Sequence, residues 1–150
     1  MKSVPPLECL GYFVTALTVS ANPKHNPEAK VELTTDDLTV TTKCVCTDKA
    51  ARRWHVQLTI RQAVGPDKNA PYNFRLVLLG EFEVVSGFPK EHERRLVETN
   101  ACSILMGSAR EVLRTAMSSG PYKPLLLPTW SFYQPPKPAA NKKGKKIAAK

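Results

Sequence analysis

The sequence lacks the long apolar run that a membrane-spanning helix needs, because none of its apolar stretches approaches ~18 residues. Its opening residues, MKSVPPLECL, contain one lysine and two prolines but no apolar core of the length found in signal peptides. These two absences predict a cytoplasmic protein. In that compartment the four cysteines, Cys9, Cys44, Cys46 and Cys102, are expected to be reduced.

Catalytic signatures are also missing. The chain has no glycine-rich loop of the kind that cradles a phosphate, and its three histidines, His25, His55 and His92, are not near a serine or cysteine in a nucleophile arrangement. Cys44 and Cys46 could join His55 around a metal, but a structural zinc site needs four ligands, so no metal is predicted. The sequence therefore predicts a protein that is not an enzyme and needs no cofactor. A small α+β enzyme is the least favoured alternative.

Acidic residues are absent from the end of the chain. Six lysines follow Gln134 with no Asp or Glu among them, and removing these six from the formal net charge of +9 leaves +3 for the rest. We therefore predict one domain over residues 1–134 and a disordered, Lys-rich basic tail over residues 135–150. The tail could bind nucleic acid or another acidic surface, so a basic adaptor or nucleic-acid-binding module is an alternative function. A solubilising tail without a dedicated target is the simpler interpretation.

The first half of the chain has the patterns of β-strands. Residues 11–21 are rich in β-branched and aromatic side chains, and a loop with two prolines follows over residues 20–30. Residues 38–47, 53–63 and 72–85 alternate between apolar and other positions, which is typical of strands with one buried face. On the last of these strands Gly80 lies on the apolar face, where it indicates a bulge or kink.

After Gly87 the spacing of apolar residues becomes helical. Residues 89–101 predict a short first helix, and the stretch NACSILMGSAREVLRTAMSSG (100–120) has apolar residues three and four apart on one face. Four strands followed by helices predict an α+β fold, in which helices pack on one face of a four-stranded antiparallel sheet.

A proline-rich apolar segment, here called the strap, covers residues 122–133. Pro124 and Pro128 prevent a regular helix, so the strap is expected to lie extended over the body of the domain. Its large apolar side chains either close the core or frame an apolar groove. In the second case, burying a few hundred Å² of a ligand's apolar surface is worth several kcal/mol at ~25 cal/mol per Å². Unfolded chains expose such surface in extended form.

The predicted long helix and the strap resemble the signature region of the SecB-like export chaperones. In that family an Asn/Cys-type loop leads to an Ile-Leu pair, an Ala-Arg-Glu sequence on a long helix, a Ser-x-Gly exit and a Leu-Pro-rich segment. The sequence NACSILMGSAREVLRTAMSSGPYKPLLLP, followed by Phe132, matches this order without a gap. The four-strand half agrees with the family in order and length, so the resemblance covers residues 8–133.

The resemblance implies an ATP-independent holdase that binds unfolded or non-native polypeptides in apolar grooves, for protein export or for a dedicated partner such as a toxin–antitoxin system. It also implies a homo-oligomer, a dimer of dimers, that pairs through an edge strand and the long helix. The client-binding groove residues implied by position are Val31, Leu33, Tyr122, Leu125, Leu127, Trp130 and Phe132. The implied subunit-interface residues are Leu105, Ala109, Arg110, Glu111 and Leu113.

Three features depart from that family. Its members dock the translocase motor through an acidic sheet surface, whereas Gly11–Pro27 contains no Asp or Glu, which counts against docking to this motor. The loop SANPKHNP lacks the aromatic residues that deepen the family's groove. Prolines up to Pro138 prevent the family's final helix there, so that a lid is missing or minimal. These departures predict a divergent, basic member.

Overall fold

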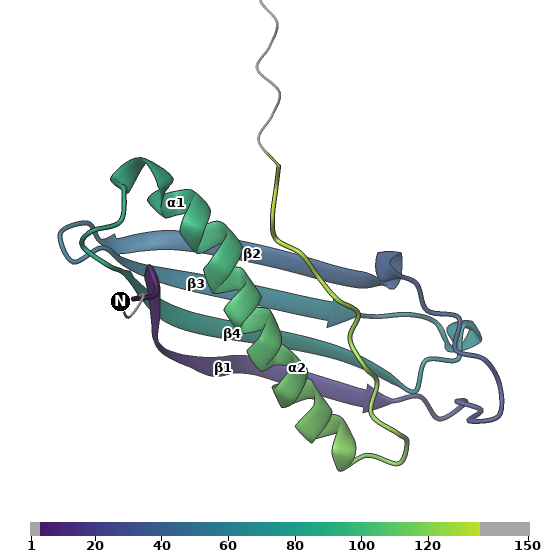
Figure 1. Cartoon of the computed structure of the whole chain (residues 1–150). Helices are drawn as coiled ribbons and strands as arrows, with labels where there is room; N and C mark the ends of the chain where they lie inside the picture. Colours follow the sequence, from purple (N-terminus) through teal and green to yellow (C-terminus); the bar gives the residue numbers. More distant parts are fainter. Residues whose placement is uncertain (1–3, 136–150) are drawn as a thin grey trace, which may run out of the picture.

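A four-stranded antiparallel sheet forms one layer of the computed structural model, which describes residues 4–135 (Figure 1). Its strands are β1 (Leu7–Ala21), β2 (Leu38–Asp48), β3 (Arg53–Gln62) and β4 (Tyr72–Val84). The strand order is β1-β4-β3-β2, so β1 and β2 are the two edges. A crossover loop, residues 22–34, leads from one edge to the other and ends in a 3-10 turn at Thr35–Asp37. A second 3-10 turn, Pro66–Lys68, lies between β3 and β4.

The central strands β3 and β4 supply about half of the core. On β3, residues alternate between buried and more exposed positions from Arg53 to Gln62, as the sequence pattern predicts. Buried residues that pair directly across the two strands are Trp54 with Phe82, Leu58 with Leu78, and Ile60 with Leu76. Burying each of these side chains is worth roughly 1.5–3 kcal/mol, so this face accounts for much of the fold's stability.

One continuous helical segment covers this face, where the sequence pattern predicts two helices. The segment begins with a 3-10 turn at Lys90–His92 and continues through α1 (Glu93–Leu96), a π-helical turn at Val97–Ala101 and α2 (Cys102–Ser118). Both ends of the π-helical turn are fully buried, so the wider turn keeps the apolar stripe against the sheet. The predicted boundary between helices falls within this turn.

Gly80 lies where α2 packs closely on β4. A Cβ atom at this position would lie 2.6 Å from the Phe82 ring and 2.9 Å from a methyl group of Leu105. The glycine therefore makes room for the helix, and the bulge predicted at Gly80 is wrong. The irregularities in the β1–β4 pairing lie on the other strand, around Leu10 and Thr15.

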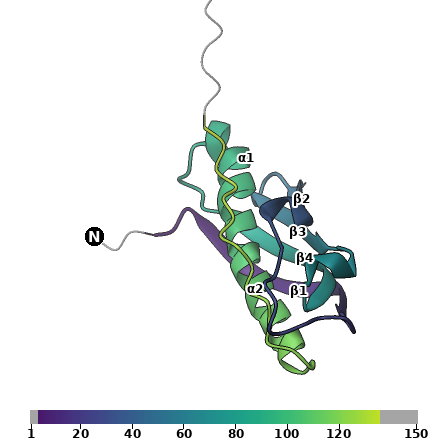
Figure 2. The same cartoon turned by 90° about the vertical axis from the view of Figure 1, so that its right-hand side faces the viewer.

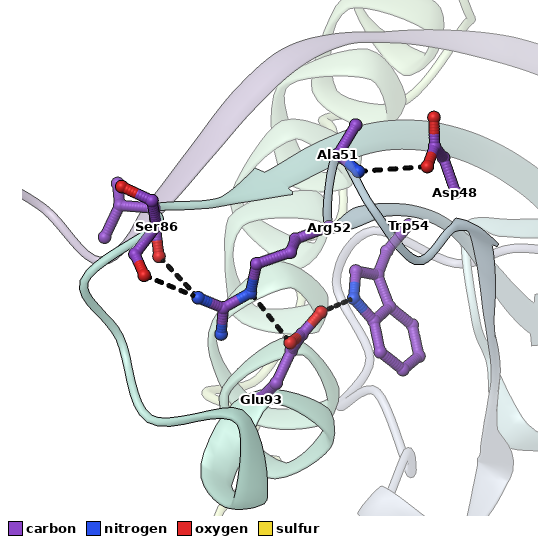
Figure 3. A network of polar contacts seen from close by, with 7 residues as sticks. Asp48, Ala51, Arg52, Trp54, Ser86 and Glu93 are labelled. Carbon is purple, nitrogen blue, oxygen red and sulfur yellow. Dashed lines mark hydrogen bonds and ion pairs between the residues drawn. The ribbon is translucent and has the colours of Figure 1, made fainter.

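A buried ion pair fixes the start of the helical segment to the turn between β2 and β3 (Figure 3). Arg52 Nε donates a hydrogen bond to Glu93 at 2.9 Å, and the indole of Trp54 donates to the same carboxylate at 2.8 Å. Arg52 Nη1 also donates to the carbonyl oxygens of Val85 and Ser86, which follow β4. One arginine thus joins three segments that are distant in the sequence.

The strap lies beside α2 on the same face of the sheet and has no regular secondary structure (Figures 1 and 2). Within the described residues, the opposite face of the sheet carries no helix (Figure 2). Among residues 4–135, no helix is long and apolar enough to cross a membrane. Apart from Pro135, the predicted tail over residues 135–150 lies outside the described residues, so the division at residue 134 stays a prediction.

Candidate functional site

Two hollows open beside the strap. The crossover hollow, of about 500 Å³, lies between the crossover loop and the first part of the strap. The β2 hollow, of about 670 Å³, lies between β2, the first part of the helical segment and the last part of the strap. Residues that line the crossover hollow include Pro27, Val31, Tyr122, Leu125 and Leu126. Residues that line the β2 hollow include Val40, Thr42, Cys44, Glu98, Trp130 and Phe132.

Hydrogen bonds to Asn69 hold the crossover loop in place. Asn69 has a φ of 53°, in the left-handed region that asparagine tolerates, and its amide donates to the carbonyl oxygens of Asn26 at 2.9 Å and Ala29 at 3.2 Å. The ring of His25 contacts that of Tyr122 edge-on, with 4.7 Å between centroids. The loop therefore forms a defined wall of the crossover hollow, which His25 also lines.

Contacts with the core hold the first part of the strap on the other side of this hollow. The Tyr72 hydroxyl donates to the carbonyl of Tyr122 at 2.8 Å and accepts from its amide at 2.8 Å. The amide of Leu125 contacts the Met117 sulfur at 3.4 Å. Leu126, by contrast, is 85% exposed. The crossover hollow thus has fixed walls and an exposed leucine among its lining residues.

The β2 hollow has a floor of small side chains and a rim of large rings. Its floor is the helix-facing side of β2, where threonine and cysteine alternate with outward-pointing residues. Trp130 and Phe132 are both half-buried there. Arg95 donates to the carbonyl of Gln134 at 3.1 Å, which holds the end of the strap against the helical segment. The result is a half-open surface of mixed character, in which the apolar rings of Trp130 and Phe132 lie among polar lining residues that include Arg95 and Glu98.

No protein-family model matches the sequence. Among curated proteins, it is 30% identical over 83 residues to the protein-export protein SecB of Mesorhizobium japonicum. The alignment covers 55% of this chain and 49% of the relative, so the chain spans about half the length of the curated relative it matches. The fold is similar to that of the SecB-like chaperone Rv1957 of Mycobacterium tuberculosis, solved in complex with a ChAD peptide from the Rv1956 HigA1 antitoxin. That match has a TM-score of 0.57 and 12% identity, over 84% of this chain and 91% of the other.

The chain is thus similar in sequence to a SecB protein and in fold to a SecB-like chaperone. The predicted resemblance to these chaperones and the predicted α+β fold are confirmed. A protein of unknown function from Streptococcus agalactiae also matches, with a TM-score of 0.46, 14% identity and coverage of 82% of this chain and 97% of that one.

The predicted groove residues divide between the two hollows and the core. Val31, Tyr122 and Leu125 line the crossover hollow, and Trp130 and Phe132 line the β2 hollow. Leu127 needs correction: it is only 7% exposed and packs in the core, because it anchors the strap between the two hollows. Leu33 is half-buried and lines neither hollow. Binding of a client at these residues stays a prediction.

Three of the predicted subunit-interface residues also need correction. Leu105, Ala109 and Leu113 face the sheet and are at most 1% exposed in a single chain, because the same helical spacing supplies the core. Arg110 donates to a carbonyl of the strap at 2.8 Å, and Glu111 forms an exposed ion pair within α2 at 2.9 Å. A role for these two in a subunit contact stays a prediction.

An exposed apolar surface lies beside these residues. A hollow of about 450 Å³ between β1 and α2 is lined by Leu17, Val112 and Ala116, among others. Val14 shares this face of β1 and is exposed. The sequence signal that points to this surface is the absence of any charged residue over positions 9–23.

The described residues, 4–135, contain no group of three or more His, Cys, Asp and Glu side chains that could hold a metal ion. Cys44 and Cys46 lie on the helix-facing side of β2, whereas His55 pairs with Val45 on the opposite side. The three residues weighed as partial metal ligands are thus not brought together. All four cysteines are free thiols.

Proposed function

We propose that this SecB-like protein is an ATP-independent holdase, which binds extended apolar segments of non-native polypeptides in the crossover and β2 hollows. The observation that carries the proposal is the set of large apolar side chains along the strap that the core leaves partly open, Trp130 and Phe132 above all. At ~25 cal/mol per Å², covering a few hundred Å² of such surface is worth several kcal/mol, enough for reversible binding.

The arrangement of the strap favours an extended ligand over a compact one. The two hollows lie on either side of the point where Leu127 anchors the strap, and exposed Leu126 lies next to that anchor. A polypeptide laid along the strap would contact both hollows with successive side chains. A folded protein keeps its apolar side chains inside and offers no such run.

The proposed activity uses binding energy alone, and so requires no nucleophile, metal or nucleotide. One relative is named for protein export and the other was solved with an antitoxin peptide. Both names refer to a polypeptide ligand, and we propose that the client of this chain is also a polypeptide. Comparing affinities for an unfolded secretory precursor and for an antitoxin peptide separates the two roles. The proposal includes a cytoplasmic site of action, where free thiols such as these persist.

The proposed holdase is a homo-oligomer in which two copies pair along β1 and the adjacent side of α2, and two such dimers associate. Edge strands of soluble proteins usually carry charged residues or prolines that prevent pairing with another chain. β1 instead exposes large apolar side chains on both of its faces, Val14 and Leu17 on one and Phe13 on the other. The hollow between Leu17 and α2 offers room for a side chain of the second copy.

An aggregation assay tests the holdase proposal. A client unfolded in denaturant and diluted into buffer should scatter less light when the protein is present at a stoichiometric amount, with or without ATP. Leu126→Ser should weaken this protection, because Leu126 is 85% exposed and its loss leaves the core unchanged. Val4→Ser, at another highly exposed aliphatic residue outside the strap, is the matched control. Aggregation at an unchanged rate for several unrelated clients would contradict the proposal.

A further inference from the structure

The outer face of the sheet, which is turned away from the helical segment and the strap, carries no helix among the described residues (Figure 2). Odd-numbered residues of β4 point to this face, since the even-numbered ones are buried on the helix side. Arg75, Leu79 and Glu81 therefore point outward. Phe13 of β1 lies opposite Leu79 and is 57% exposed. An exposed aromatic ring and several charges thus lie on a surface that no other element among residues 4–135 covers.

Unpaired charges of opposite sign lie toward opposite ends of the outer face. Arg61 and Arg75 lie directly opposite each other on β3 and β4, and both are exposed. Like charges in this position destabilise a sheet. Glu81 lies six residues further along β4. None of the ion pairs among the described residues involves these three side chains, so their charges are available to a partner.

The outer face is complementary to itself when a second copy is placed on it by a two-fold rotation. The axis would run across the strands at the level of Leu78. Arg75 and Glu81 each lie three residues, about 10 Å, from this level and on opposite sides of it. The rotation exchanges the two positions, so that Glu81 of each copy meets Arg75 of the other. A contact of this kind is isologous and closes after two copies.

The same rotation also matches the apolar side chains. Leu79 and Val77 each lie one residue from the level of Leu78, so Leu79 of one copy would meet Val77 of the other. Their partners on β1 are Phe13 and Ala16, respectively. The large ring of Phe13 would therefore meet the small side chain of Ala16, and the ring would be covered.

The remaining charges and the size of the face are compatible with this contact. Arg61 would meet His55, and Lys43 would meet Thr41, so no two residues of the same formal charge are brought together. Packed sheets are tilted by about 30°, and a long arginine side chain spans the resulting offset of roughly 5 Å at Glu81. Four strands about 4.8 Å apart present roughly 600 Å² per copy, which is at the lower end for a specific interface.

We propose that the outer face binds the outer face of a second copy of this chain, with Glu81–Arg75 ion pairs on both sides of a two-fold axis at Leu78. The inference deepens the proposed homo-oligomer and rests on it, because this contact would join two dimers that are each paired along β1. Two paired dimers would also bury about twice the area of two single chains. The contact leaves the crossover and β2 hollows open, since the strap that lines both lies on the other face of the sheet.

Exchanging the charges tests the contact, with native mass as the measurement. Glu81→Arg and Arg75→Glu each place like charges opposite each other on both sides of the axis. Each variant should therefore fall from four chains to two, with Kd raised roughly 100-fold. An equal mixture of the two variants should return to four chains, because every such pair between them then joins opposite charges. Lys43→Glu makes the same charge change as Arg75→Glu on the same face, and this matched control should keep the parent mass.

Two further variants separate this contact from misfolding and from pairing along β1. Arg75→Glu replaces a like-charge pair with an opposite-charge pair across from Arg61, so it should not destabilise the single chain. Val14→Lys should leave particles of two chains, which the addition of Arg75→Glu should separate into single chains. If the charge exchange lowers the mass but Val14→Lys does not, the pairing along β1 is wrong and the outer-face contact stands.

Three results would overturn the proposal. The first is a parent mass that Glu81→Arg leaves unchanged, and the second is a mixture of the two variants that stays at two chains. The third is a fall in mass for Arg75→Glu without one for Glu81→Arg, which would indicate that the arginines bind a different acidic group. Each of these results leaves the holdase proposal intact, because the aggregation assay measures client binding on the other face.

Discussion

The two edge strands of the sheet are built from opposite kinds of residue. Along β2, threonines and Lys43 occupy most of the outward positions, as expected of an edge that must not pair with another chain. Along β1 there is no charged residue after Glu8, and Tyr12, Phe13 and Val14 are exposed in succession. Both strands have a partner on one side only, β4 for β1 and β3 for β2. The sheet therefore protects one edge and leaves the other apolar and open.

The same asymmetry is seen in what each edge contacts. The turn after β2 is tied to the start of the helical segment by Arg52 and Glu93, and the strap passes beside the helix-facing side of β2. Beside β1, by contrast, the hollow at Leu17 is lined only by residues of β1 and α2, and no residue of the strap lines it. We infer a division of tasks, with clients bound next to β2 and a second copy of the chain bound at β1.

The largest expected effect on stability comes from the buried Arg52–Glu93 ion pair, which joins the turn after β2 to the helical segment. Glu93→Ala leaves the Arg52 charge buried and unpaired, since the two side chains are only 7% and 13% exposed, and should lower the free energy of unfolding by about 3–5 kcal/mol. Urea denaturation measures this change. Glu98→Ala, which removes an exposed ion pair with Arg94, should cost less than about 1 kcal/mol. Equal losses of unfolding free energy in the two variants would show that the buried Arg52–Glu93 pair stabilises the fold no more than an exposed ion pair does.

The next effect separates the two edges directly. Val14→Lys places a charge on the open edge, where pairing with a second copy would bury it, and should weaken association by about 3 kcal/mol, or roughly 100-fold in Kd. Val45→Lys makes the same change on β2 at nearly the same exposure, 44% compared with 41%. Native mass measured over a range of concentrations should fall for the first variant only. A fall for both or for neither would remove the distinction between the edges.

A smaller effect is expected on client affinity at the β2 hollow. Trp130→Ala removes a half-buried ring from its rim and should weaken binding of an unfolded polypeptide by about 1–2 kcal/mol, roughly tenfold. Fluorescence anisotropy with a labelled, permanently unfolded client measures this Kd. Val45→Ala, on the opposite face of β2, is the control and should bind as the parent chain does. An unaltered affinity in Trp130→Ala would show that the client does not bind in the β2 hollow.

The smallest effect concerns the 3-10 turn that leads into β2. The pKa of Asp37 is lowered, chiefly by the hydrogen bond from the Thr34 amide and also by Lys68. Because the folded-state pKa is the lower one, its contribution to stability is present above the ordinary value of 3.8 and is lost as the pH falls through the folded pKa. Asp37→Asn should therefore destabilise the protein slightly at neutral pH, and this difference should vanish in strong acid.

Urea midpoints measured from neutral to acid pH test this dependence. Asp36→Asn, at the exposed neighbour, is the control. A penalty for Asp37→Asn that does not change with pH would show that its charge is not what stabilises the turn.

The sheet and its buried face could be predicted from the sequence because they depend on local alternation. The spacing from Trp54 to Ile60 shows which side of β3 is apolar, and the structure buries that side. Pro124 and Pro128 predicted an extended strap over the domain, and the structure gives the strap no regular secondary structure. An apolar stripe on a helix does not show whether its residues face a sheet of the same chain or a second chain. For this reason the sequence assigned Leu105, Ala109 and Leu113 to a subunit interface, whereas the structure packs them against the sheet.

Features that depend on contacts between distant residues could not be predicted. Arg52 and Glu93 are 41 positions apart, and neither belongs to a recognisable motif. Leu127 lies in a run of three leucines, and nothing in that run indicates that the last is buried while Leu126 is almost fully exposed.

The emission of Trp130 tests the central claim most directly. The chain has two tryptophans, and Trp54 is buried at 5% exposure, so a response to a ligand in the β2 hollow comes from Trp130. Titration with an unfolded polypeptide that lacks tryptophan should shift this emission to shorter wavelength in a saturable way, without ATP, and the shift should be absent in Trp130→Phe. Saturable binding of the same client with no change in Trp130 emission would contradict the account.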